Sequence, residues 1–163
     1  MRTLTDIFEI IEKEHIIIEE VDLQNNIDGI YLKIPDLYPI IGVSTSIIND
    51  NKKYISTLAE ELGHHFTSLG DLTAEYFTYS DRILRAKQEY KARRWAANFL
   101  ISTNDLIHAL SSSITSLSDL SNYFSVSCEL IKIKIISLNL DISSITVLDC
   151  IKDNEILYNQ CLI

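Results

Sequence analysis

The chain has 163 residues, of which 47% are hydrophobic, and its formal net charge at pH 7 is −9. This length suits one domain with a small appendage, and the apolar fraction is enough for a packed core. The negative charge argues against a nucleic-acid-binding protein, because phosphate contacts need clustered Lys and Arg side chains.

The sequence also argues against membrane insertion and secretion. No stretch reaches the roughly 18 to 20 unbroken apolar residues of a membrane span. The N-terminus carries four acidic residues within its first 14 in place of a basic, then apolar, leader. The cysteines lie far apart and form no CxxC pair, which suits a reducing compartment; they are Cys128, Cys150 and Cys161. We therefore expect a cytoplasmic protein without a membrane partner.

The first third of the chain predicts one helix and a small sheet. Apolar residues recur at helical spacing over 3–14. Three runs rich in β-branched residues follow at 15–23, 29–34 and 39–48, separated by turn sequences. Because these runs lie close together in sequence, they predict a three-stranded sheet with antiparallel pairing.

Two longer helices are predicted next, over about 52–68 and 81–101. After them the chain becomes serine-rich, and "SDLSNYFSVSCELIKIKI" reads as a helix, a turn and a second helix with Ser127 as N-cap. This part resembles a helix-turn-helix, but 103–163 holds three lysines against seven acidic residues, which is unusual for a DNA reader. We therefore predict an α+β fold with a main domain, 1–102, and a small helical packing unit, 103–163.

The helix over 52–68 places metal-binding side chains one turn apart. Glu60 and His64 are at i and i+4 on the side opposite the apolar residues, and Glu61 is next to them. Two such side chains can hold one metal ion, while the adjacent carboxylate reaches a water bound to it. Taken alone, the more ordinary interpretation is a solvated polar face. The apolar side consists of Ile55, Leu58, Ala59, Leu62 and Phe66.

The helix over 81–101 carries a second unusual pair. Glu89 and Arg93 share its apolar face, where charged groups are costly unless they are paired or coordinating. They either pair with each other at i and i+4, or both point at the first helix beside His64, and we favour the second arrangement. The other residues of that face are Ala92, Ala96, Phe99 and Leu100.

The stretches "TLAEELGHHF" and "KQEYKARRWAANFLI" resemble the ImmA/IrrE metallopeptidase family, whose usual motifs are HELGH and ExxA[ND]xFAxxLL. The likeness extends to the preceding strands and to the trailing helices. It implies a zincin-like fold, Zn²⁺ as cofactor, and cleavage of a regulatory protein such as a helix-turn-helix repressor of a phage or mobile element. In that family two histidines and the glutamate of the second motif hold the metal, and a further glutamate is the general base.

Carried over position by position, the resemblance makes Glu61 the general base, with His64 and Glu89 as metal ligands. Two positions depart from the pattern. Glu60 stands where the first histidine ligand is expected, and Arg93 stands where Asn or Asp would steady that histidine. Because a glutamate calls for a basic neighbour, the two changes predict a salt bridge between Glu60 and Arg93 across the two helices.

The consequence of this swap for the metal stays open at the level of sequence. If Glu60 is a ligand, two carboxylates and one imidazole suit Zn²⁺, and they favour Mn²⁺ or Fe²⁺ more than two histidines would. If Arg93 engages Glu60 instead, His64 and Glu89 hold metal weakly or not at all, and the chain is a non-catalytic protein-binding module. Asp71 is an alternative third ligand, although an acid after glycine is usually a turn residue.

Three neighbouring side chains receive simpler interpretations. His65 is expected to be a hydrogen-bonded packing residue rather than a ligand. Thr67, on the same face as His64, is a candidate to hydrogen-bond a ligand. Trp95 with Phe99 is expected in the core, and the cysteines are expected to be inert because they lack a histidine partner for catalysis.

Overall fold

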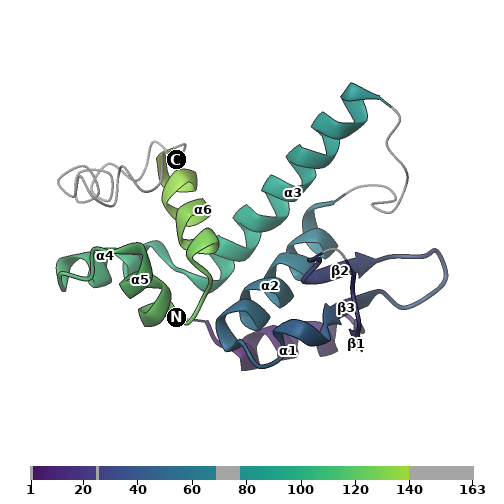
Figure 1. Cartoon of the computed structure of the whole chain (residues 1–163), viewed down its shortest axis with the longest axis horizontal. Coiled ribbons are helices and arrows are strands. Elements are labelled where there is room, and N and C mark those ends of the chain that lie inside the picture. The colour runs from purple at the N-terminus through teal and green to yellow at the C-terminus, as the bar shows by residue number, and fades with distance from the viewer. Residues whose placement is uncertain (1, 25, 69–77, 140–163) are drawn as a thin grey trace.

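The computed structural model describes residues 2–24, 26–68 and 78–139, and its arrangement is shown in Figure 1. It confirms the α+β class, with a three-stranded sheet and six helices in the described part of the chain. The helices are α1 Leu4–Lys13, α2 Asn51–Thr67, α3 Tyr79–Leu100, α4 Thr103–Ser111, α5 Leu117–Phe124 and α6 Cys128–Asn139. The strands are β1 Ile17–Val21, β2 Gly29–Leu32 and β3 Ile40–Ser44, and a 3₁₀ turn follows at Thr45–Ile47.

The sheet is mixed, so the prediction of antiparallel pairing throughout is wrong. The strand order is β1-β3-β2, with β2 antiparallel and β1 parallel to the central β3. Strand β3 takes the middle because its side chains are the most buried, with Ile41 and Val43 fully enclosed. Strand β1 carries exposed Glu19 and Glu20 and therefore belongs at an edge. Strand β2 forms the other edge.

Helix α2 lies at the centre of the molecule, in contact with α1, α3, β2 and β3 (Figure 1). Its predicted apolar side is confirmed except at one position. Phe66 is 44% exposed, because in the last turn of the helix its ring stacks on Trp95 of α3 rather than entering the core. Trp95 and Phe99 are only partly buried, although they pack against the core and stack on each other with ring centres 5.0 Å apart.

Helices α2 and α3 touch at backbone level. A Cβ atom at Gly63 would lie 2.3 Å from the carbonyl oxygen of Ala92, so no larger residue fits there without moving a helix. Ala92 and Ala96 are fully buried along the same face of α3, as predicted. This close approach brings the residues that flank it on the two helices, including Glu89, to one place.

The C-terminal helices join the same core. The amide of Leu130 donates to Ser127 Oγ at 3.2 Å, which confirms Ser127 as the N-cap of α6. The amide of Ser127 in turn donates to Ser56 Oγ of α2 at 2.8 Å, and α6 packs along α3. Buried apolar residues from all six described helices and from β2 and β3 form one continuous cluster. The division at residue 102 stays a prediction.

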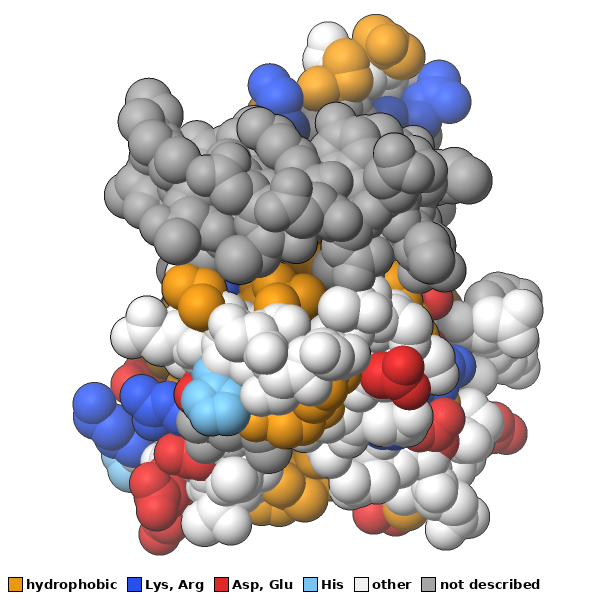
Figure 2. All heavy atoms as spheres, turned by 90° about the vertical axis from the view of Figure 1, so that its left-hand side faces the viewer, with side chains coloured by type: hydrophobic (Ala, Val, Ile, Leu, Met, Phe, Trp, Pro, Cys, Tyr) orange, Lys and Arg blue, Asp and Glu red, His pale blue; other side chains and the backbone are white. Residues whose placement is uncertain are grey.

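None of the described helices combines the length and the apolar character that crossing a membrane requires. Figure 2 views the molecule from the side on which α4 and α5 lie. Among the side chains coloured there, Lys and Arg do not gather into a continuous patch, and acidic side chains lie between them.

Candidate functional site

A cavity of about 1100 Å³ lies between β2, α2, α3 and α6. It brings together the residues that the sequence singled out on the two long helices. Acidic side chains outnumber basic ones in its lining, so it favours cationic groups. The acids are Asp28, Glu60, Glu61, Glu89 and Glu129, and the bases are Lys53, Arg85 and Arg93, with His64 beside them.

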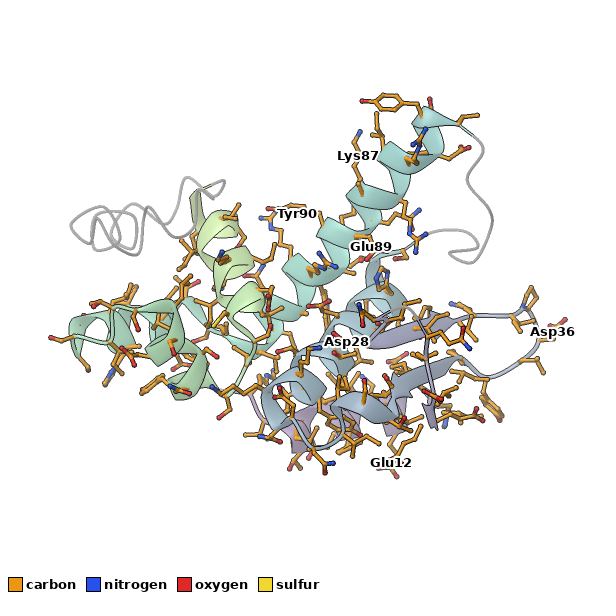
Figure 3. The ribbon with its side chains drawn as sticks, in the orientation of Figure 1. Glu12, Asp28, Asp36, Lys87, Glu89 and Tyr90 are labelled. Carbon is orange, nitrogen blue, oxygen red and sulfur yellow. The ribbon has the colours of Figure 1, made fainter. Side chains whose placement is uncertain are left out.

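The His64 ring is held at both nitrogens. It is buried in the last turn of α2, with Nδ1 2.9 Å from the hydroxyl of Ser68, the residue that caps this helix. Its Nε2 lies 3.4 Å from Oε2 of Glu89, which projects from α3 toward α2 (Figure 3). Ser68 was missed by the sequence reasoning, although a serine four residues after a candidate ligand is a detectable signal. With Nδ1 satisfied by Ser68, Nε2 is the ring atom directed at the cavity.

The predicted contact between Glu60 and Arg93 is present. The Nε atom of Arg93 lies 3.4 Å from Oε2 of Glu60, so a side chain from each long helix bridges the gap between them. The prediction that Arg93 lies on the buried face is wrong. Its side chain is 50% exposed, because it lies at the edge of the helix contact where the guanidinium reaches both Glu60 and solvent.

The three carboxylates of the site differ in their acidity. Burial, followed by the charges of Glu60 and Glu89, raises the pKa of Glu61 to about 8. Burial also raises the pKa of Glu60, and it outweighs the opposing effect of Arg93. The hydrogen bond with His64 lowers the pKa of Glu89. Glu61 is thus the carboxyl group that can hold a proton near neutral pH, whereas Glu89 stays ionised.

Gly29 at the start of β2 makes room for Glu61. A Cβ atom there would lie 2.7 Å from Oε1 of Glu61 and 2.5 Å from Cγ2 of Thr57. Any larger residue would push this carboxylate out of its place. The sequence reasoning did not single out Gly29, because nothing local distinguishes it from an ordinary turn glycine.

Other predicted residues take structural positions. His65 Nδ1 lies 2.8 Å from the hydroxyl of Tyr31, and its Nε2 lies 3.5 Å from Glu14, which confirms a packing role. Thr67 donates to the backbone carbonyl one turn earlier in α2, at 2.8 Å, so its hydroxyl is not directed at a ligand. Asp71 lies outside the described residues.

One further cavity residue was not anticipated. Tyr90, which follows Glu89 on α3, lines the cavity, and its hydroxyl is buried. It is the single buried side-chain polar atom in the described part of the chain that has no hydrogen-bond partner. Buried polar groups are almost always satisfied, so this unpaired hydroxyl is an unusual feature of the cavity wall.

The family comparison agrees with this geometry. The model of the peptidase M78 family, described as the IrrE N-terminal-like domain, matches residues 13–135. The match covers 123 of the 163 residues and includes both helices of the site. The chain belongs to this family. Its membership places it in a metallopeptidase family, while comparison with curated proteins and with solved structures found no match.

The donors of this IrrE-family site fit a metal ion in kind but only partly in position. Two ligands about 2.0–2.1 Å from a tetrahedral Zn²⁺ are roughly 3.4 Å apart, and His64 Nε2 and Glu89 Oε2 have this spacing. Within 2–24, 26–68 and 78–139, however, no three His, Cys, Asp or Glu side chains converge as a metal site requires. The third donor position holds Glu60, which is turned to Arg93.

Proposed function

We propose that this IrrE-family chain is a metal-dependent endopeptidase. The observation that supports this best is the placement of one buried carboxyl group, Glu61, beside the His64–Glu89 pair in a single cavity. A carboxyl group in the same cavity as the candidate metal donors can accept a proton from a water held there, which is the task of a general base.

Each residue has a defined task in this proposal. His64, Glu89 and Glu60 would hold the ion, with Zn²⁺ as the expected cofactor and Mn²⁺ or Fe²⁺ as alternatives. When bound, such an ion would supply Lewis-acid chemistry at the scissile carbonyl and lower the pKa of the attacking water. Glu61 would take a proton from the attacking water and return it to the leaving amine. Ser68 contacts Nδ1 of His64 and so leaves Nε2 as the ring nitrogen available to a ligand.

The shape of the cavity supports a polypeptide as substrate. Strand β2 pairs with β3 alone among the described strands, and its residues 29–31 line the cavity beside Glu61. An extended peptide can add to such an edge through its backbone groups, which would lay its carbonyls along the carboxylates. The resemblance to the ImmA/IrrE family implies a helix-turn-helix repressor as the substrate, and we propose such a protein here. The net charge of −9 would complement the basic surface of a DNA-binding protein.

A second function is favoured by one contact. The ion pair between Glu60 and Arg93 occupies the third donor of the site, which is what a non-catalytic protein-binding module would show. In that case the same cavity and β2 edge would bind a segment of a partner protein without cutting it. The two functions differ in whether metal binds and whether Glu61 is needed.

Metal analysis and one substitution separate these functions. The protein would be purified without chelators and its metal content measured, and it would then be incubated with Zn²⁺ and a mixture of random-sequence peptides whose fragments are identified by mass spectrometry. The endopeptidase predicts one bound metal ion per chain, and cleavage that Glu61→Gln reduces by about 10²- to 10⁴-fold. Metal-bound protein that cleaves no peptide, or cleaves equally well with Glu61→Gln, would refute the proposed role of Glu61.

A further inference from the structure

Arg93 lies in the same cavity as the three carboxylates of the site. It contacts Glu60 directly, while Glu61 and Glu89 line the cavity with it. A bound divalent cation would place its positive charge among the same three groups. The guanidinium therefore already supplies part of the positive charge that these carboxylates require.

The contact between Arg93 and Glu60 is suited to exchange. It joins one nitrogen, Nε, to one oxygen at 3.4 Å, which is longer than a strong charge-assisted hydrogen bond. Half of the Arg93 side chain is exposed, so the guanidinium can move into water without leaving a buried charge behind. Glu60 is more enclosed, with 25% of its side chain exposed, and keeps its need for a cation when Arg93 leaves.

The other two donors do not depend on this exchange. His64 is fixed by Ser68 and already lies 3.4 Å from Glu89. Glu89 also lies near Arg85, whose Nε is 3.6 Å from Oε1, but its other oxygen, Oε2, is the one that faces His64. Glu60 is therefore the donor that has to leave its arginine before a third group can face the pair.

We propose that Arg93 competes with a divalent cation for Glu60, so that this arginine sets the metal affinity of the site. The inference rests on the proposed function, because it takes Glu60, His64 and Glu89 as metal donors. It accounts for two departures from the family motifs that occur together. Glu60 stands in place of a histidine, and Arg93 stands in place of Asn or Asp. Removing the guanidinium charge should free Glu60 and strengthen metal binding.

Zinc titration against a chromophoric chelator tests this inference on the full-length chain. Arg93→Gln is expected to raise zinc affinity by about ten-fold or more, whereas Arg93→Lys, which keeps a charge, should raise it less. Lys91→Gln is the matched control, because Lys91 is exposed on the same helix and should change the affinity by less than about two-fold. Circular dichroism melting of each variant would establish that it is folded.

A double substitution isolates the role of Glu60. If Arg93 acts through Glu60, the gain should disappear in the Glu60→Gln, Arg93→Gln double variant. A gain that persists there would overturn the inference, because it would reflect only the general loss of a positive charge. Zinc binding by the wild type that Arg93→Gln leaves unchanged would overturn it as well, with the metal-dependent function intact. A failure of all variants to bind zinc would refute both.

Discussion

The cavity and the C-terminal helices differ in how their buried polar side chains are satisfied. In α4, α5 and α6 most buried positions are apolar, and the buried polar side chains, Ser121, Lys134 and Ser137, each donate a hydrogen bond. Each of these helices also begins with a serine that accepts a hydrogen bond from its first turn; these serines are Ser102, Ser116 and Ser127. Around the cavity, three carboxylates crowd together and one tyrosine hydroxyl is unpaired. Polar groups that are left under strain mark the place where a chain gives up stability for function.

The largest expected change in the free energy of unfolding comes from Glu61→Gln in metal-free protein. The pKa of Glu61 is about 8 in the folded state against 4.5 in the unfolded state, so the folded state keeps a proton that the unfolded state releases. The free energy of unfolding of the wild type should therefore fall as the pH rises from about 4.5 to 8. The variant lacks this loss and should be more stable near pH 8 by on the order of 4 kcal/mol.

Urea unfolding with a chelator present, at about pH 5 and about pH 8, would measure this difference. Glu129→Gln is the matched control, because Glu129 lines the same cavity but is exposed, and it should change little. A wild type as stable as Glu61→Gln near pH 8 would show that burial of this carboxylate is not costly.

Leu120→Ala should act in the opposite direction. Leu120 of α5 is fully buried, so its truncation should lower the free energy of unfolding by about 3 kcal/mol. Because α5 contributes nothing to the cavity lining, zinc affinity measured below the melting temperature should stay the same. A parallel fall in zinc affinity would mean that the two regions are not as separate as the contrast requires.

Gly63→Ala tests the contact that creates the cavity. Helix propensity alone predicts that this change stabilises α2 by up to about 1 kcal/mol. The new Cβ atom would instead lie 2.3 Å from a carbonyl oxygen of α3, so we expect a loss of about 2 kcal/mol and weaker zinc binding as the helices separate. The sign of the change in unfolding free energy, from urea titration, decides between the two.

The smallest expected effect comes from a matched pair of tyrosines. Tyr90→Phe removes a buried hydroxyl that has no partner among the described residues, so it should raise the free energy of unfolding by about 1 kcal/mol. Tyr31→Phe removes a hydroxyl that lies 2.8 Å from His65 and should lower it by a similar amount. The melting temperatures of the two variants would test this. A shift in the same direction for both would contradict the difference expected between the unpaired and the paired hydroxyl.

The sequence predicted the helices of the site and one of its contacts, because these depend on local rules. Spacing of i and i+4 put Glu60 and His64 on one face of α2, and opposite charges at two departing positions predicted the pair that Glu60 makes with Arg93. The first inference needs only the helical period, whereas the second also needs the family motifs from which the two positions depart.

Features that depend on tertiary packing were not predictable in this way. The central place of β3 and the parallel pairing of β1 with it depend on how the strands assemble, which periodicity within each strand does not reveal. Phe66 has an apolar side chain in the right register, yet it lies beyond the part of α2 that faces the sheet core. Gly29 acts through Thr57 and Glu61, neighbours that only the assembled fold supplies. Ser68 is different, because it lies four residues after His64 and local spacing could have indicated it.

The backbone contact between Gly63 and Ala92 is a point about which α3 could tilt as a rigid body. Glu89 lies three residues before Ala92, about 4.5 Å along the helix axis, whereas Tyr79 at the start of α3 lies about 20 Å from the same point. If α3 tilts as a rigid rod about this fulcrum, a displacement of about 4 Å at Tyr79 moves Glu89 by about 1 Å relative to His64. A displacement of the N-terminal end of α3 would therefore produce a smaller displacement of Glu89, on the ångström scale that matters for coordination distances.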